Sequence, residues 1–308
     1  MERKVIVIVG PTCSGKTKVG ISLAEKLHTE IISADSRQIF KYLNIGTAKP
    51  SEDELARNKH HFIDFLEPDE DYNVSKFETD ALQILDGLLA KGKVPIVVGG
   101  SGLYIKALTD GIFNSVDVDE EYREELKQKR EEFGIDFLYE GLKKVDPQSA
   151  SKMLPQNWKR VMRALEVFHL TGEPILKFQN AHERKVDLEF IQFGLNWDRT
   201  KLYANIENRV DEMIEKGLVD EVKNILASGF SKNINALNTV GYKEIISSLE
   251  KEITLEYAVE LIKRNTRRYA KRQMTWFKKT KGINWLACNE NTTPEELVSM
   301  ILKKYVES

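Results

Sequence analysis

A glycine-rich segment near the start of the chain has the residue types that bind phosphate. It reads Gly10-Pro11-Thr12-Cys13-Ser14-Gly15-Lys16-Thr17, the pattern G-x-x-x-x-G-K-[ST]. Backbone N–H groups of such a loop point at an anion, the lysine adds positive charge, and the threonine hydroxyl can ligate Mg²⁺. We therefore predict that these eight residues bind a diphosphate, with Thr17 as the metal ligand. The loop alone does not say which phosphate compound it holds.

An acidic residue, Asp35, directly follows the apolar run Ile31-Ile32-Ser33-Ala34. Parallel sheets bind ligands at the carboxyl ends of their strands, so Asp35 is a candidate base or metal-binding group. Alternatively, its side-chain oxygen caps the following turn. Position alone leaves both interpretations open.

A serine follows another apolar run in a similar way. Val94 to Val98 leads into Gly99-Gly100-Ser101-Gly102-Leu103. The nucleophile elbow of hydrolases needs G-x-S-x-G, and Leu103 occupies the position of the last glycine. We therefore expect the Ser101 hydroxyl to form a hydrogen bond with an anion rather than to act as a nucleophile. The alternative is a turn residue without a ligand.

The segment from 263 to 281 is strongly basic, with nine Lys or Arg and no acidic residue. Arg264, Arg268 and Arg272 follow each other at helical spacing, and Ile262 and Phe277 belong to an apolar stripe. One face of this helix should pack, and the other should meet a polyanion. A merely solvated face would normally mix charge signs, so we favour nucleic acid.

The elements that must position these residues alternate between apolar runs and helical patterns. Continuous apolar strands separated by helices indicate an α/β core with a parallel sheet covered on both faces. The expected strands are Val5–Val9, Glu30–Ser33, Phe62–Phe65, Val94–Val98 and Phe190–Leu195.

A charged helical segment interrupts this core. We predict a core domain of residues 1–115 plus 188–308, with C-terminal helices, and a helical insertion of residues 116–187. A second, smaller basic set in the insertion, Lys159, Arg160 and Arg163, suggests a further contact with nucleic acid. Such contacts would be salt-sensitive and largely independent of sequence.

Composition limits the class of protein. The chain has 308 residues and a formal net charge of -2, and no apolar run approaches the roughly 20 residues of a membrane span. Only five apolar residues precede Gly10, too few for a signal-peptide core. Two distant cysteines indicate a reducing cytoplasm. We expect a cytoplasmic monomer without membrane association.

Together these motifs resemble the tRNA dimethylallyltransferase family, also called tRNA isopentenyl transferases, of bacterial type. The resemblance covers nearly the whole chain in family order. Its pieces are Gly10 to Thr17, Ser33 to Gln38, Asn44 to Pro50, Gly99 to Tyr104, Arg160 to Glu166, Gly241-Tyr242 and Ala270 to Phe277.

The resemblance implies a P-loop NTPase-like core and transfer of a dimethylallyl group from dimethylallyl diphosphate to N6 of adenosine 37, in tRNAs that read codons beginning with U. It implies Mg²⁺ as cofactor. Asp35 would accept the N6 proton, Ser101 would hydrogen-bond the adenosine amine or a bridging phosphate oxygen, and Arg209 would help neutralise the diphosphate. The expected tRNA contacts are Asp35, Ser36, Arg37, Gln38, Ser101, Arg123, Lys159, Arg160, Val161, Met162, Arg163, Arg268 and Arg272.

Two other functions fit parts of the sequence. A P-loop kinase that uses ATP on a small metabolite would explain the phosphate loop, and arginines of the insertion could serve its lid. A non-catalytic RNA-binding protein would explain the basic helix but would leave the phosphate loop and Asp35 without a role.

Overall fold

The computed structural model describes residues 3–113, 116–181 and 187–307. The chain divides into two compact units, one made of residues 1–109 and 187–308, the other of residues 110–186. The predicted ends of the insertion adjoin residues 114–115 and 182–186, which lie outside the described residues. In the described ranges, no helix combines the length and apolar character needed to cross a membrane.

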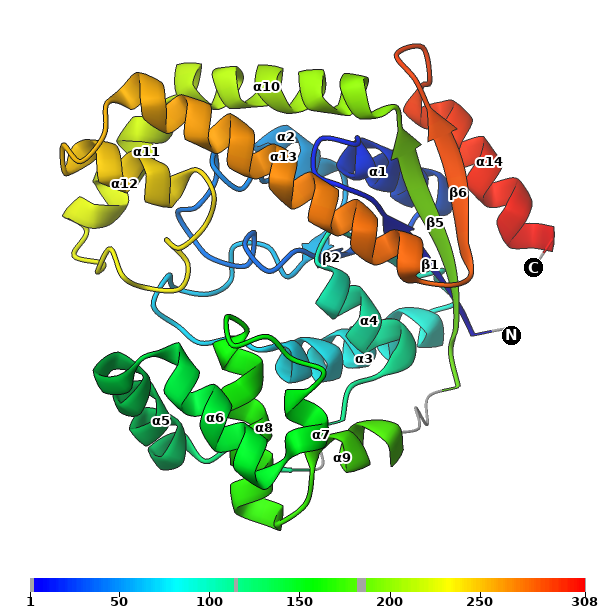
Figure 1. Cartoon of the computed structure of the whole chain (residues 1–308). Coiled ribbons are helices and arrows are strands. Elements are labelled where there is room, and N and C mark those ends of the chain that lie inside the picture. The colour runs from blue at the N-terminus through cyan, green and yellow to red at the C-terminus, as the bar shows by residue number, and fades with distance from the viewer. Residues whose placement is uncertain (1–2, 114–115, 182–186, 308) are drawn as a thin grey trace. The chain divides into compact units, whose positions relative to one another are not determined.

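A six-stranded sheet forms the centre of the first unit (Figure 1). All neighbouring strands are parallel, which confirms the predicted α/β core. Val9 and Ala34, at the ends of two strands, both pair with Gly99. The segments that follow these three strands therefore start at one edge of the sheet. In spatial order the strands are β3 (His60–His61), β2 (Ile31–Ala34), β4 (Ile96–Gly99), β1 (Lys4–Val9), β5 (Glu189–Trp197) and β6 (Ile283–Cys288).

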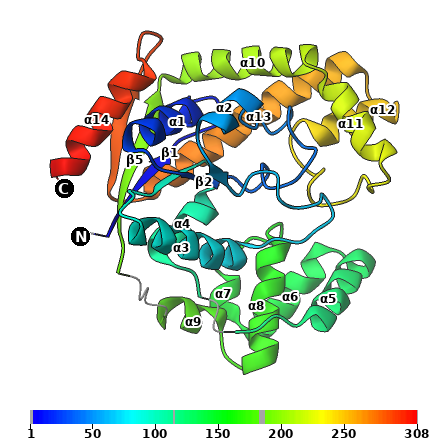
Figure 2. The same cartoon turned by 180° about the vertical axis from the view of Figure 1, so that it is seen from behind.

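Helices cover both faces of the sheet, and alternate side chains of β1 enter two different cores. Val5, Val7 and Val9 pack with the helices of one face, and Ile6 and Ile8 pack with those of the other. This two-sided burial explains why the strands are continuously apolar. One face carries α3 (Val74–Ala90), α4 (Gly102–Asp110), α12 (Tyr242–Leu249) and α13 (Leu255–Lys279), and the other carries α1 (Lys16–Leu27) and α14 (Pro294–Glu307). Figure 2 shows α1 and α14 side by side from behind.

The remaining helices of the first unit are α2 (Glu52–Arg57), α10 (Arg199–Glu215) and α11 (Leu218–Ala227). Helix α10 packs against α13, and Ile206 of α10 shares a cluster with Ala270 of α13; both helices are seen in Figure 1.

The second unit is helical and has its own core. Leu142, Val161 and Ala164 are fully buried in it. Its first helix is capped by Asp119, whose side chain accepts a hydrogen bond from the backbone N–H of Tyr122. The helices are α5 (Glu120–Phe133), α6 (Ile135–Val145), α7 (Pro147–Ala150), α8 (Trp158–Thr171) and α9 (Ile175–Ala181).

The predicted strand at Phe62–Phe65 is wrong. The edge strand β3 is limited to His60–His61, and Phe62 and Asp64 have φ angles of 62° and 59°, so the backbone turns there. The Phe62 ring instead packs 5.2 Å from that of Phe77 in the core. Its apolar character therefore reflects burial and not a strand. Strand β6 and helix α14 were not among the elements expected from the sequence.

Candidate functional site

The phosphate loop lies between β1 and α1, as its sequence predicts. Gly15 precedes the helix with φ 86°, in the left-handed region that favours glycine. The Lys16 ammonium lies back over the loop and donates a hydrogen bond of 2.6 Å to the carbonyl of Pro11. Backbone amides, a helix N-terminus and an ammonium group thus converge on one place.

Burial lowers the pKa of Lys16 to about 8, and the nearby Arg209 guanidinium acts in the same direction. The Asp35 carboxylate opposes this shift. Lys16 therefore lies within electrostatic reach of both residues. A lysine with a pKa this low is typical of functional sites, because burial of a cation costs free energy and strongly shifted pKa values cluster at such sites.

Two side chains from distant segments hold the loop. The Trp197 indole donates a hydrogen bond of 3.0 Å to the carbonyl of Ser14, and the amide oxygen of Gln273 accepts one of 2.8 Å from the backbone N–H of Thr12. The buried Cys13 side chain packs in a small apolar cluster with Ile206 and Ala270, which favours its interpretation as a small packing residue over that of a reactive thiol.

Asp35 caps the turn that follows β2, which was the alternative interpretation of this residue from the sequence. Its Oδ1 accepts hydrogen bonds from the backbone N–H groups of Arg37, at 2.8 Å, and Gln38, at 3.4 Å. In the part of the chain that the structure describes, Oδ2 forms no hydrogen bond, and Asp35 lines the large cavity of the first unit. One oxygen therefore shapes the turn while the other is free for chemistry.

Ser101 is tied to the turn after β2. Its hydroxyl accepts a hydrogen bond of 3.0 Å from the backbone N–H of Ser36 and lies 3.3 Å from the Ser36 hydroxyl. Gly99 must be glycine, because an added Cβ would come within 2.2 Å of the carbonyl oxygen of Ala34. The cavity lining includes Gly99 and Gly100 but not Ser101.

The polar residues after Asp35 are engaged in holding loops together. The Arg37 guanidinium donates a hydrogen bond of 2.8 Å to the carbonyl of Asn235, and burial lowers its pKa. The Gln38 amide donates to the carbonyls of Thr47, at 3.2 Å, and Ala48, at 3.1 Å. Both residues also line the cavity, so these contacts position them at its surface.

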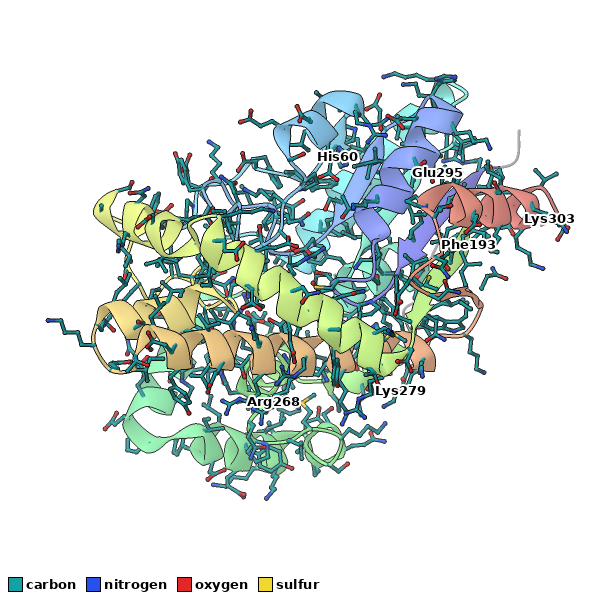
Figure 3. The ribbon with its side chains drawn as sticks, turned by 90° about the horizontal axis from the view of Figure 1, so that it is seen from above. His60, Phe193, Arg268, Lys279, Glu295 and Lys303 are labelled. Carbon is teal, nitrogen blue, oxygen red and sulfur yellow. The ribbon has the colours of Figure 1, made fainter. Side chains whose placement is uncertain are left out.

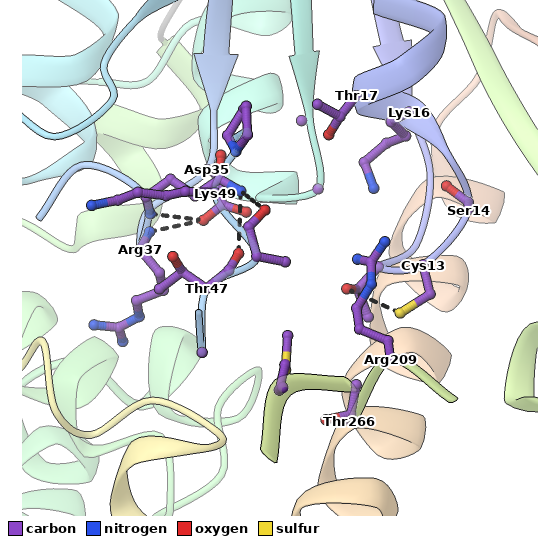
Figure 4. Close-up of a pocket in the computed structure, with 18 of the residues that line it drawn as sticks. Cys13, Ser14, Lys16, Thr17, Asp35, Arg37, Thr47, Lys49, Arg209 and Thr266 are labelled. Carbon is purple, nitrogen blue, oxygen red and sulfur yellow. Dashed lines mark hydrogen bonds between the residues drawn. The ribbon is translucent and has the colours of Figure 1, made fainter. Parts of the chain in front are cut away.

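A cavity of about 1460 Å³ unites most of these groups. Its lining comes entirely from the first unit and includes Lys16, Thr17, Asp35 and Arg209. In Figure 4, Asp35 lies across the cavity from Lys16 and Arg209. Two cations therefore lie on the phosphate-loop side of the cavity, and a carboxylate lies on the opposite side.

The basic helix α13 separates into exposed and paired cations. Lys263 and Arg267 form ion pairs with Asp211, at 2.6 Å, and Glu207, at 2.7 Å. The others are exposed, and among the described residues they have no carboxylate partner. The exposed set, which we call the α13 cations, is Arg264, Arg268, Lys271, Arg272, Lys278 and Lys279. Figure 3 shows Arg268 midway along the helix and Lys279 at its end.

The predicted RNA contacts of the second unit differ in their environment. Glu166 is fully buried, and it accepts hydrogen bonds from Arg123, at 3.1 Å, and Arg163, at 2.5 Å. These two arginines thus hold the unit together. The side chains of Val161 and Met162 are buried in the helical core, and the tRNA contacts expected of these two residues stay a prediction. Lys159 and Arg160 are exposed.

Because Arg163 is paired with the buried Glu166 and Arg160 is exposed, substitutions at these two positions should affect stability differently. Arg163→Ala should lower the free energy of unfolding by about 1–3 kcal/mol, because it removes a partner of the buried Glu166 carboxylate. Arg160→Ala, the matched control, should change it by less than about 0.5 kcal/mol. Urea denaturation followed by circular dichroism measures both. Equal effects would contradict the structural role of Arg163.

No sequence pattern indicated Glu221, which holds the loop Asn44 to Pro50. Glu221 accepts hydrogen bonds from the backbone N–H groups of Asn44, Ile45 and Gly46, at 3.0, 2.8 and 3.2 Å. Its other partner is the Tyr242 hydroxyl, at 2.6 Å. For Gln273, which contacts the phosphate loop instead, the sequence did hold a signal. A polar residue on the packed face of a helix requires a hydrogen-bond partner.

The described residues contain no cluster of three His, Cys, Asp or Glu side chains able to hold a metal by themselves. The Thr17 hydroxyl of the phosphate loop is in the cavity lining, as are the carboxylates of Asp35, Asp64 and Glu212. Mg²⁺ commonly binds through one or two protein groups together with substrate phosphates and water. The donor set therefore fits a Mg²⁺ ion that arrives with a diphosphate.

Comparison with known proteins gives a consistent result over the whole chain. Residues 38–280 match the model of the IPP transferase family. The tRNA dimethylallyltransferase of Acetivibrio thermocellus is 46% identical over 304 residues, which cover 98% of this chain and 97% of that protein. That of Pelotomaculum thermopropionicum is 45% identical over 307 residues, covering 99% and 97%.

Solved structures agree with these relatives. The full-length tRNA isopentenylpyrophosphate transferase of Bacillus halodurans is 37% identical, with a TM-score of 0.72, covering 99% of this chain and 97% of that one. A eukaryotic dimethylallyltransferase acting on tRNA is 29% identical, with a TM-score of 0.81, covering 99% and 80%. With the phosphate loop after β1 and a parallel sheet, the fold is P-loop NTPase-like. The chain belongs to the tRNA dimethylallyltransferase family.

Proposed function

We propose that this protein transfers the dimethylallyl group of dimethylallyl diphosphate to N6 of adenosine 37, in tRNAs that read codons beginning with U. The cavity between the phosphate loop and Asp35 carries this proposal. At about 1460 Å³ it exceeds the roughly 300–1,000 Å³ of ordinary small-ligand pockets, and it has room for a diphosphate together with a nucleoside. Its cations and its carboxylate lie where the leaving group and the nucleophile would need them.

The diphosphate end must stabilise a leaving group of high negative charge. Lys16, Arg209 and the loop amides would bind its oxygens, and Thr17 would hold Mg²⁺. Mg²⁺ bound by these groups would supply positive charge beside the diphosphate. Arg209 suits this task because it lines the cavity and lies close enough to Lys16 to lower its pKa.

The nucleophile end must remove a proton. As N6 of adenine bonds to C1 of the dimethylallyl group, the C1–O electron pair leaves with the diphosphate, and the nitrogen gains positive charge. Asp35 would take the N6 proton at that stage, when the proton is acidic, through the oxygen that shapes no turn. Ser101 would bind the adenosine amine or the bridging oxygen; to donate to it, its hydroxyl must turn from the Ser36 hydroxyl but can still accept from the Ser36 N–H.

The tRNA would be held chiefly by its backbone. The α13 cations, with Lys159 and Arg160, are exposed and free to contact phosphates, while Arg37 and Gln38 would contact the nucleotide that enters the cavity. Adenosine 37 must leave the anticodon stack, which costs a few kcal/mol that these contacts offset.

A transfer assay tests the function. The protein is incubated with labelled dimethylallyl diphosphate, Mg²⁺ and a tRNA transcript with adenosine at position 37, and the control transcript carries guanosine there. Label should enter the first transcript and not the second. Label in AMP but not in tRNA would refute the tRNA substrate. ATP hydrolysis without prenyl transfer would support a kinase, and tight RNA binding without modification would support a non-catalytic binder.

The α13 cations give a salt-dependent prediction. Arg268→Ala should weaken tRNA binding and reduce the slope of log K against log salt concentration by about 0.7–0.9, the value for one phosphate contact. Arg267→Ala should leave the slope unchanged, because that arginine is paired with Glu207. Filter binding between about 50 and 200 mM salt measures both variants. Identical slopes in wild type and Arg268→Ala would remove Arg268 from the interface.

One chain would suffice for the reaction, since one unit supplies the whole lining of the cavity. We therefore propose an active monomer, which size-exclusion chromatography with activity measured across the peak would test. Both cysteines, Cys13 and Cys288, are free and buried, which suits a reducing cytoplasm.

A further inference from the structure

A glutamine in the basic helix α13 is buried between two loops of the site. Gln273 is only 7% exposed, although its neighbours Lys271 and Arg272 are exposed. Its amide oxygen accepts the hydrogen bond from the backbone N–H of Thr12, in the phosphate loop, at 2.8 Å. Its amide nitrogen donates one of 2.9 Å to the carbonyl of Gly100, in the turn after β4.

The close packing around these bonds leaves no room for another side chain. A Cβ added to Gly100 would lie 2.3 Å from the amide nitrogen of Gln273, and one added to Gly102 would lie 2.5 Å from the Trp276 indole. On the phosphate-loop side, Ala270 packs in the same cluster as Cys13. One face of α13 thus touches both the loop that begins the site and the turn that carries Ser101.

We propose that Gln273 is a positioning residue that fixes the phosphate loop relative to the Ser101 turn. The inference rests on the proposed function, in which the loop binds diphosphate. Thr12 and Gly100 follow different strands. The neutral amide of Gln273 links them, because it accepts from Thr12 and donates to Gly100. Without it the two segments could move relative to each other, and small misplacements of reacting groups are costly.

Gln273→Met tests the proposal, since methionine has a similar length but forms neither hydrogen bond. We expect binding of inorganic diphosphate, measured by calorimetry with Mg²⁺, to weaken about tenfold. The kcat for transfer should fall by at least as much, while the KM for tRNA stays within about twofold. Glu260→Met, at an exposed position of the same helix that has no part in the proposed site, is the matched control and should leave diphosphate binding and kcat unchanged.

Gln273→Glu adds a test that a general loss of stability would not reproduce. A protonated carboxyl group can still accept from Thr12 and donate to Gly100, whereas an ionised one cannot donate. Burial favours the protonated form and raises the pKa of such a group. The diphosphate affinity of Gln273→Glu, divided by that of wild type at each pH, should therefore be near one at low pH and fall as pH rises.

The outcomes separate this inference from the function on which it rests. If wild type binds no diphosphate, the proposed function of the phosphate loop fails. If wild type binds it and Gln273→Met matches wild type in affinity and kcat, the positioning role is refuted. If Gln273→Met does not fold, the Gln273→Glu ratio decides, and a ratio that stays constant with pH refutes the role.

Discussion

Replacing Asp35 by asparagine is expected to lower the kcat of dimethylallyl transfer by about 10²–10⁴-fold, the usual contribution of a general base. Asparagine keeps the shape and the Oδ1 acceptor of aspartate. The hydrogen bonds from the backbone N–H groups of Arg37 and Gln38 should therefore persist, and with them the turn after β2. What the variant loses is an oxygen able to take a proton.

Binding and chemistry should separate in this variant. The affinity for tRNA should stay within about twofold of wild type, because one acceptor still shapes the turn that positions Arg37. Asp35→Ala breaks the turn as well, so it should impair tRNA binding more than Asp35→Asn does. Single-turnover transfer and filter binding on the same preparations measure the two effects. A wild-type rate in Asp35→Asn would remove Asp35 from proton transfer.

The sequence was informative where chemistry depends on local pattern. The glycines between Gly10 and Thr17 allow the backbone conformation of a phosphate loop, so the sequence pattern was enough to predict it. Continuous apolar runs predicted β1, β2 and β4 because both faces of the sheet are covered. Since parallel strands end at one edge, the placement of Lys16 and Asp35 near each other followed from those runs. Local sequence patterns were therefore enough to place Lys16 and Asp35 at the same edge of the sheet.

Contacts between distant segments were not predictable in the same way. Gln273 is 261 residues from Thr12, and Glu221 is 177 residues from Asn44, so no spacing rule links them. The basic residues show a second limit. The charge of Arg163 is visible in the sequence and predicts an RNA contact, whereas its ion pair with the buried Glu166 depends on helix packing and was not predictable. Charge indicates function only when its partners are known.

Replacing Lys16 by methionine is expected to lower kcat/KM for dimethylallyl diphosphate by about 10²–10³-fold, the effect of removing one preorganised donor to developing charge. Methionine retains the apolar length of lysine, so the helix start at Gly15 should be preserved. Lys26→Met, a change to an exposed lysine in the same helix, is the matched control and should leave kcat/KM unchanged. Steady-state kinetics with saturating tRNA measure both variants.

The pH dependence of diphosphate binding adds a signature that is specific to Lys16. Burial holds the pKa of Lys16 at about 8 without ligand, and a bound diphosphate favours the ammonium form and raises this pKa. Binding therefore takes up a proton above pH 8, so the affinity should change little near pH 7 and weaken by up to tenfold per unit as pH rises through 8. Dimethylallyl diphosphate is fully ionised in this range, because its last phosphate pKa is about 6. In Lys16→Met the affinity should be low and free of this transition, and a transition that persisted there would assign it to another group.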